Sequence, residues 1–163
     1  MREQPKQPIR ELSWDNIDDL MYTLANNMIH QIPDLKNKFL VPICRGGLVP
    51  CGILSYHLAL AVKGAIRVTS YIPVKGIVNI TEDTYYSPVL HKDMIFVDDI
   101  VDTGDTFIAL AQHYPAARYV CPVGKPKGVN AANHILAVQP ILNVPDVEWV
   151  SFPWDRNQPI TKA

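Results

Sequence analysis

The sequence predicts a single α/β domain built on a central, mainly parallel sheet flanked by helices. Short apolar runs that suit buried strands alternate along the chain with segments of helical periodicity, an order typical of strand-helix-strand units. The chain has 163 residues, 48% of them hydrophobic, which suits one domain with one sizeable core. Such sheets bind ligands at the carboxyl ends of their strands. We therefore expect residues 1–163 to form one domain with its site at that edge.

The first third of the chain predicts an arm, a helix, a strand and a second helix. Residues 1–12 carry two prolines and mixed charge, and we expect them to form a loose N-terminal arm. Ser13 is suited to cap a helix over 14–30. The apolar run 39–43 predicts a strand, and the segment 48–62 returns to helical periodicity.

The rest of the chain predicts further strands around one clear helix. Residues 72–93 mix β-forming residues with Pro, Gly and acids, which indicates a long loop or an extended hairpin. The helix is expected over 106–114, directly after an apolar run that suits a strand buried on both faces. The expected strands are 65–71, 94–97, 118–123 and 134–138.

Composition excludes several classes of protein. The 15 Lys and Arg nearly balance 16 Asp and Glu, so no global basic field attracts nucleic acid or an anionic membrane surface. The polar N-terminus lacks the apolar core of a signal peptide, and no run reaches the roughly 18 apolar residues of a membrane span. Three cysteines without a CxxC pair favour a reducing compartment. We expect a cytoplasmic protein with neither nucleic-acid binding nor membrane insertion.

Two adjacent acids, Asp98 and Asp99, stand where the strand 94–97 ends. Successive strand residues project from opposite faces, so the pair can contact two sides of a ligand. Carboxylates accept hydrogen bonds from sugar hydroxyls or hold a hard divalent cation, and they repel a bare phosphate. The alternative is an ordinary strand-to-helix turn in which Asp98 or Asp102 caps the helix.

The residues that follow, DTGDT at 102–106, are suited to hold a phosphate. They supply hydroxyls at Thr103 and Thr106, a flexible Gly104, and backbone N–H groups at a helix N-terminus. Acids beside a phosphate loop indicate a ligand that carries both hydroxyls and phosphate.

A second candidate anion site is the segment CRGGLVP, which joins the strand 39–43 to the next helix. Its two glycines let the backbone approach a ligand, and Arg45 offers a charged fork to a diphosphate. An isolated RGG is equally consistent with a tight turn that carries a surface arginine.

The string VDDIVDTGDT resembles the hallmark of the type I phosphoribosyltransferases: a hydrophobic run, two acids, two apolar residues, then an acid with TG and a closing T. The segments SWDNIDDL, CRGGLVP, TSY, VDDIVDTGDT, GKPKG and EWVSFPWD also occur in the order seen in bacterial xanthine-guanine phosphoribosyltransferases, over roughly residues 13–155. The resemblance implies the type I fold with a small hood and a mobile loop, and assembly as a homodimer or homotetramer. It further implies Mg²⁺-dependent transfer of the 5-phosphoribosyl group of phosphoribosyl pyrophosphate to N9 of guanine, xanthine or hypoxanthine.

The resemblance also assigns the residues that would bind phosphoribosyl pyrophosphate. Asp99 is the better candidate to reach Mg²⁺. The CRGG loop would bind pyrophosphate. In the family this loop often contains a strained peptide bond just before the arginine, which here is Cys44–Arg45. Asp105 departs from relatives, which often have Gly or Lys there, and it places a negative charge beside the phosphate loop. The implied donor site comprises Arg45, Gly46, Asp98, Asp99, Ile100, Val101, Asp102, Thr103, Gly104, Asp105 and Thr106.

For the purine, the resemblance implies that Lys125 donates to the 6-oxo group and that Trp149 stacks on the base. An ammonium only donates hydrogen bonds, so it favours a 6-oxo over a 6-amino purine, and indole gives a broad stacking face. Val150 would use its backbone groups, Asp155 would face the 2-position, and Asp102 would accept the N7 proton as the catalytic base. The alternatives are a solvated loop lysine, a core aromatic, and a cap or turn at Asp155.

The mobile loop is the weakest part of the resemblance. Family members usually carry an arginine there, but residues 72–93 contain none. Ser70, Tyr71 and Lys75 are the candidate loop residues, with Lys75 the best-placed substitute for the arginine. Ser151 replaces a glutamate common in close relatives, so the resemblance does not set the preference among purines.

Two other functions stay open at this point. One is a regulator that senses phosphoribosyl pyrophosphate with little catalysis, favoured by the arginine-free loop and by Asp105 but disfavoured by the near-neutral charge. The other is a phosphoribosyltransferase for another nucleobase, which Lys125 and the WVSFPWD segment disfavour.

Overall fold

A five-stranded sheet in the order β4-β3-β2-β5-β7 forms the centre of the protein. The computed structural model describes residues 7–69, 79–82 and 88–156. All neighbouring strands of this sheet are parallel except β4, which pairs antiparallel with β3. The predicted α/β fold with a mainly parallel central sheet is therefore confirmed. The strands are β2 (Phe39–Cys44), β3 (Ile66–Thr69), β4 (Asn79–Glu82), β5 (Met94–Val97) and β7 (Arg118–Val120).

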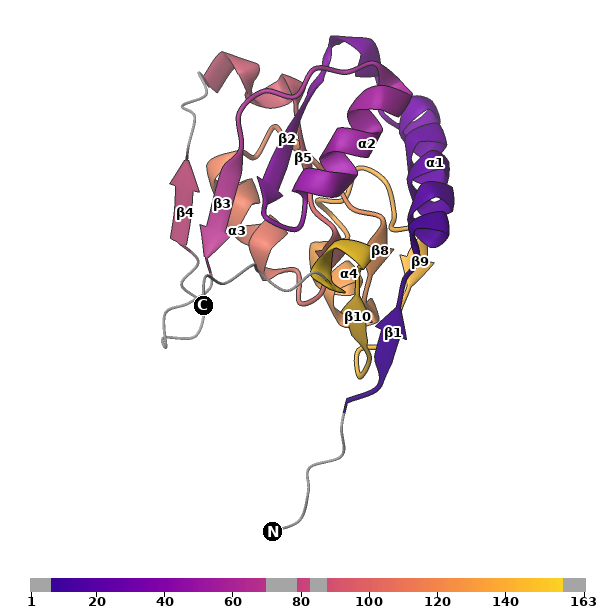
Figure 1. Cartoon of the computed structure of the whole chain (residues 1–163). Helices are drawn as coiled ribbons and strands as arrows, with labels where there is room; N and C mark the ends of the chain where they lie inside the picture. The colour runs from indigo at the N-terminus through magenta and orange to yellow at the C-terminus, as the bar shows by residue number, and fades with distance from the viewer. Residues whose placement is uncertain (1–6, 70–78, 83–87, 157–163) are drawn as a thin grey trace, which may run out of the picture.

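Helices cover both faces of this sheet (Figure 1). The helices α1 (Trp14–Gln31) and α2 (Leu48–Leu58) pack on one face, and α3 (Asp105–His113) packs on the other. A hydrophobic core lies on each face of the sheet, and successive residues of β2 point into opposite cores. Leu40 packs with α1 and α2, while Val41 packs with α3. The predicted cap of α1 is present, because the Ser13 hydroxyl accepts from the Asn16 N–H at 3.1 Å.

Two small sheets lie beyond the carboxyl ends of the central strands (Figure 1). One pairs β1 (Ile9–Glu11) with β10 (Trp149–Ser151), and the other has the order β6-β8-β9. Together with α4 they form the hood that the resemblance implied. Its remaining elements are β6 (Ile100–Val101), β8 (Val123–Gly124), α4 (Pro126–Ala132) and β9 (Leu142–Asn143), and short 3-10 helices span Leu35–Asn37, Pro88–Asp93 and Pro153–Arg156.

Three element predictions were wrong. The helix predicted over 48–62 ends at Leu58, because Ala59 adopts a left-handed conformation and the chain turns back to pair Val62 with Leu40. The strand predicted over 118–123 divides at Pro122, which lacks the N–H that a ladder needs. The segment 134–138 forms only a single bridge, between Leu136 and Tyr119, instead of a strand.

The N-terminal arm predicted over 1–12 is also not wholly loose, because residues 9–11 form β1. Its partner strand lies about 140 residues away, so no local pattern revealed the pairing. Within 72–93, predicted as a long loop or an extended hairpin, residues 79–82 form β4, whose antiparallel partner β3 lies before this segment. None of the helices in the described ranges is long and apolar enough to cross a membrane.

Candidate active site

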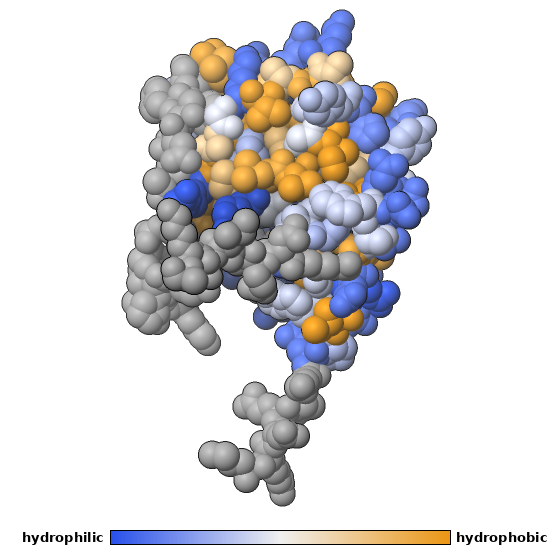
Figure 2. All heavy atoms as spheres, viewed as in Figure 1, coloured by the Kyte–Doolittle hydropathy of each residue, from blue (hydrophilic) through white to orange (hydrophobic). Residues whose placement is uncertain are grey.

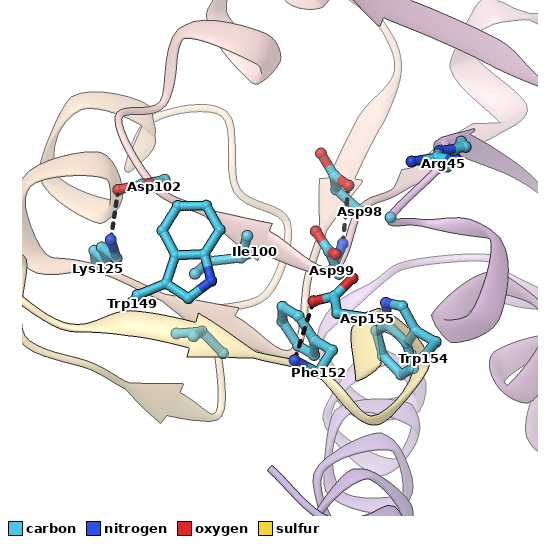
Figure 3. Close-up of a pocket in the computed structure, with 12 residues that line it drawn as sticks. Arg45, Asp98, Asp99, Ile100, Asp102, Lys125, Trp149, Phe152, Trp154 and Asp155 are labelled. Carbon is cyan, nitrogen blue, oxygen red and sulfur yellow. Dashed lines mark hydrogen bonds and ion pairs between the residues drawn. The ribbon is translucent and has the colours of Figure 1, made fainter. Parts of the chain in front are cut away.

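A cavity of about 670 Å³ opens at the carboxyl ends of β2 and β5, against the hood. Figure 3 shows Lys125, Asp102 and Trp149 on one side of it, with Asp98, Asp99, Asp155 and Arg45 on the other. Segments far apart in the sequence thus meet at the edge where the sequence predicted the site. The lining residues are Arg45, Gly46, Asp98, Asp99, Ile100, Asp102, Lys125, Trp149, Val150, Phe152, Trp154 and Asp155.

The two acids after β5 have different neighbours. The Asp98 carboxylate turns back and accepts from the Asp99 N–H at 2.9 Å (Figure 3). Burial, and next the charge of Asp99, raise the pKa of Asp98 well above its ordinary value. Burial is also the main reason that the pKa of Asp99 rises to about 6, and the nearby Asp155 carboxylate raises it further. Burial disfavours the charged forms of both carboxyl groups. A ligand that brings a cation or hydroxyl donors would therefore bind favourably beside them.

The CRGG loop places Arg45 at the same cavity. The peptide bond between Cys44 and Arg45 is cis, at the position where the resemblance implied a special peptide bond. A Cβ on Gly46 would lie only 2.5 Å from the Asp99 carboxyl carbon, so a glycine lets this loop approach the strand-end acids. The loop and the acids therefore share one ligand-binding region.

Asp102 and Lys125 form an ion pair between Oδ1 and Nζ at 3.1 Å (Figure 3). Lys125 is 4% exposed, so it is a buried cation and not a solvated loop lysine. Its backbone N–H donates to the Val101 carbonyl at 2.9 Å, and Pro126 begins α4 directly after it. Asp102 follows β6 and Lys125 follows β8, so the pairing of these two strands holds the Asp102 carboxylate beside the Lys125 ammonium.

Strand β10 and the residues after it also line the cavity. Trp149 is 56% exposed and lines the cavity, which excludes the alternative of a core aromatic. The Asp155 carboxylate accepts from the Phe152 N–H at 3.1 Å. Asp155 thus stabilises a local turn, which was the alternative to its predicted role in purine binding. Phe152 and Trp154 stack with ring centroids 4.8 Å apart. Neither ring was predicted as a site residue, although both line the cavity.

A smaller hollow of about 210 Å³ lies over residues 98–107. Gly104 has a φ of 88°, a left-handed conformation that favours glycine, and it precedes the first turn of α3. The Thr103 hydroxyl donates to the Asp105 carboxylate at 2.9 Å. Asp105 is exposed in the first turn of α3, where an acid interacts favourably with the helix dipole, which gives this departure from relatives a structural reason.

Replacing Gly128 with alanine is expected to destabilise the fold and displace Asp102. A Cβ on Gly128 would overlap the Asp102 carbonyl group, and a backbone group cannot rotate away. We expect a loss of about 1–3 kcal/mol in the free energy of unfolding, measured by urea denaturation. Asn130→Ala, on the exposed face of α4, is the control and should leave the stability within about 0.5 kcal/mol. An equally stable Gly128→Ala would contradict this tight packing.

The structure brings together every candidate donor and purine residue that it describes, in the large cavity or the adjoining small hollow. Ser70, Tyr71 and Lys75, the candidate mobile-loop residues, lie outside the described residues. In the described ranges no group of three or more His, Cys, Asp or Glu side chains could hold a metal ion.

Comparison with known proteins agrees with this site. The family model described as "Phosphoribosyl transferase domain" matches residues 13–155. A xanthine-guanine phosphoribosyltransferase of Idiomarina loihiensis is 30% identical over 154 residues, which span 90% of this chain and 86% of that protein. The purine phosphoribosyltransferase of Pyrococcus horikoshii has a similar structure, with a TM-score of 0.67, 26% identity, and coverage of 94% of this chain and 98% of that one. A xanthine-guanine-hypoxanthine phosphoribosyltransferase of Helicobacter pylori shares the fold, with a TM-score of 0.65, 22% identity, and coverage of 90% and 94% of the two chains. The chain therefore belongs to the phosphoribosyltransferase family.

Proposed function

We propose that the protein transfers the 5-phosphoribosyl group of phosphoribosyl pyrophosphate to N9 of a 6-oxopurine, in purine salvage. The observation that carries the proposal is the buried Lys125 ammonium beside Asp102, in the cavity that Trp149 also lines. A buried donor without acceptor capacity suits a 6-oxo group, and an adjacent carboxylate suits the proton at N7.

On the donor side, Asp98 and Asp99 would accept hydrogen bonds from the ribose hydroxyls, and residues 102–106, which line the small hollow, would hold the 5′-phosphate. Asp99 would hold Mg²⁺, which typically binds one or two carboxylates together with substrate phosphates and water. The acids fit such an ion, because both are buried close together beside an open cavity. When bound, Mg²⁺ would neutralise charge on the pyrophosphate.

On the base side, Trp149 would stack on the purine while Lys125 donates to O6. The Asp102 carboxylate would accept the N7 proton as N9 bonds to the ribose carbon and the bond to pyrophosphate breaks. Arg45 and the amides of its loop would stabilise the charge of the departing pyrophosphate. Catalysis on this scheme is positioning and electrostatics.

One assay tests the proposal and separates the alternatives. The purified protein, phosphoribosyl pyrophosphate and Mg²⁺ are combined in turn with guanine, xanthine, hypoxanthine, adenine, uracil and orotate, and pyrophosphate release is measured. We expect release with at least one 6-oxopurine and little with the other bases. Release only with adenine or a pyrimidine would assign another nucleobase, and no release with any base, despite donor binding, would favour the sensing regulator.

We also propose that the chain forms a homodimer or homotetramer through α2. This helix contains no Asp, Glu, Lys or Arg, yet Leu48 and Tyr56 are exposed on it, Tyr56 by 90%. Figure 2 shows apolar residues gathered on the face that α2 occupies in Figure 1. A helix that is apolar on all sides is ordinarily buried, which favours coverage by a second copy.

Tyr56→Glu is expected to shift the protein to a monomer, because a two-fold interface would bury this charge twice. Light scattering after size-exclusion chromatography measures the molar mass. Val89→Glu, at an exposed apolar residue outside α2, is the control and should keep the parent's mass. A monomeric parent, or a Tyr56→Glu variant that stays associated, would contradict assembly through α2.

A further inference from the structure

We propose that the N-terminal strand β1 is a positioning element for purine binding: it fixes the strand that carries Trp149 and Val150. The inference rests on the proposed function and adds a role for residues 7–11, which contribute nothing to the cavity lining. Its basis is the pairing of β1 with β10, an ion pair beside that pairing, and the lack of any core role for β1.

Strand β1 buries no side chain of its own. Residues 9–11 are all exposed, including Ile9 at 64%. A strand without core contacts adds stability through its ladder, and here that ladder joins only β10. Within the described residues β10 likewise pairs with no other strand. Because Trp149 is itself more than half exposed, its position depends on the backbone of β10, which the β1 ladder holds together with the buried side chains of Val150 and Phe152.

The ladder also decides which edge of β10 faces the cavity. The Trp149 N–H donates to the Pro8 carbonyl at 2.8 Å, and the Leu12 N–H donates to the Ser151 carbonyl at 3.0 Å. Backbone groups of successive strand residues point to alternate edges, so those of Val150 point away from β1. Val150 lines the cavity, and its N–H and C=O are thus available to the edge of a base.

An ion pair and a side-chain cap hold the segment that leads into β10. Arg10 donates to both Glu148 carboxylate oxygens, from Nε at 2.8 Å and from Nη2 at 3.2 Å. This bidentate ion pair links β1 to the residue directly before Trp149. Slightly earlier, Asp146 accepts from the Lys127 N–H at 3.1 Å, which ties the same segment to α4. Arg10 itself is placed in no binding or catalytic role, so it acts through Glu148 and β10.

The test compares four proteins: the parent, a deletion of residues 2–10, Arg10→Ala, and the exchanged pair Arg10→Glu with Glu148→Arg. KM for guanine, KM for phosphoribosyl pyrophosphate and kcat are measured for each, and thermal unfolding records stability. We expect KM for guanine to rise about tenfold in the deletion, since several backbone hydrogen bonds are lost, and two- to fivefold in Arg10→Ala. KM for phosphoribosyl pyrophosphate should stay within about twofold, because its site lies on β2, β5 and α3. The exchanged pair should restore much of the loss.

Lys38→Ala is the matched control. It removes another ion pair, Lys38 with Asp93 at 3.3 Å, which lies at the amino ends of β2 and β5, away from the cavity. It should lower stability without changing KM for guanine. An unchanged KM for guanine in both the deletion and Arg10→Ala, or an equal rise in both KM values, would overturn the role of β1. A parent that converts no base would instead refute the proposed function, and binding of guanosine 5′-monophosphate, followed by tryptophan fluorescence, would then test β1 directly.

Discussion

Asp102→Asn is expected to lower kcat by about 10²- to 10⁴-fold, the usual contribution of a general base, with little change in affinity for phosphoribosyl pyrophosphate. The amide cannot take a proton from N7 at neutral pH. It keeps an oxygen in the place from which Asp102 contacts Lys125 at 3.1 Å, so the ammonium retains an acceptor. Pre-steady-state measurement of nucleotide formation gives the chemical step, and calorimetric titration gives donor affinity.

The control for this variant is Asp105→Asn, the same change three residues later in the same loop. Asp105 is exposed and accepts from the Thr103 hydroxyl at 2.9 Å, and it does not line the large cavity that holds Asp102 and Lys125. We expect its kcat to stay within about threefold of the parent, since exposed hydrogen bonds contribute little. Donor affinity should be equal or slightly higher, because a negative charge beside the phosphate is removed. Normal turnover in Asp102→Asn would exclude Asp102 as the proton acceptor.

Asp99→Asn is expected to weaken phosphoribosyl pyrophosphate binding by about 10- to 100-fold while stabilising the ligand-free protein at neutral pH. Its carboxylate would contact the ribose and Mg²⁺, so its loss removes charged hydrogen bonds and a metal ligand. Yet burial raises the pKa of Asp99 from 3.8 to about 6, which means that the fold disfavours this charge. Each unit of pKa shift corresponds to about 1.4 kcal/mol, so we expect a gain of about 1–3 kcal/mol above pH 7.

The sign of the pH dependence follows from proton binding. Between pH 4 and pH 6 the folded parent holds a proton on Asp99 that the unfolded chain has lost, so its stability falls as the pH rises through this window. Below pH 4 both states are protonated and the penalty vanishes. The advantage of Asp99→Asn should therefore be near zero at pH 4 and full above pH 7, as measured by urea denaturation at several pH values.

The exposed Asp105→Asn again serves as the control and should show no comparable gain in stability. A variant Asp99→Asn that is no more stable than the parent at pH 8 would contradict an unfavourable buried charge at this position. Unchanged donor affinity would remove Asp99 from the donor site. The two results are independent, because stability is measured without ligand.

The features that could be predicted from the sequence alone are local. The apolar run 94–97, the acids after it and the DTGDT loop are contiguous, so composition and spacing were enough to predict a strand, a turn and a phosphate cradle. The cap at Ser13 could be predicted for the same reason. The family resemblance then supplied Lys125 and Trp149, whose residue types alone favoured a surface lysine and a core ring.

The features that could not be predicted from the sequence involve residues that are distant in the chain. The exposed β1 carries no apolar alternation, and its pairing with β10 depends on backbone hydrogen bonds that any sequence could make. The end of α2 at Leu58 accompanies the pairing of Val62 with Leu40, more than twenty residues earlier in the chain. The raised pKa of Asp99 likewise depends on burial and on Asp155, more than fifty residues away. Such features arise from contacts between distant segments, which a local pattern of residues does not encode.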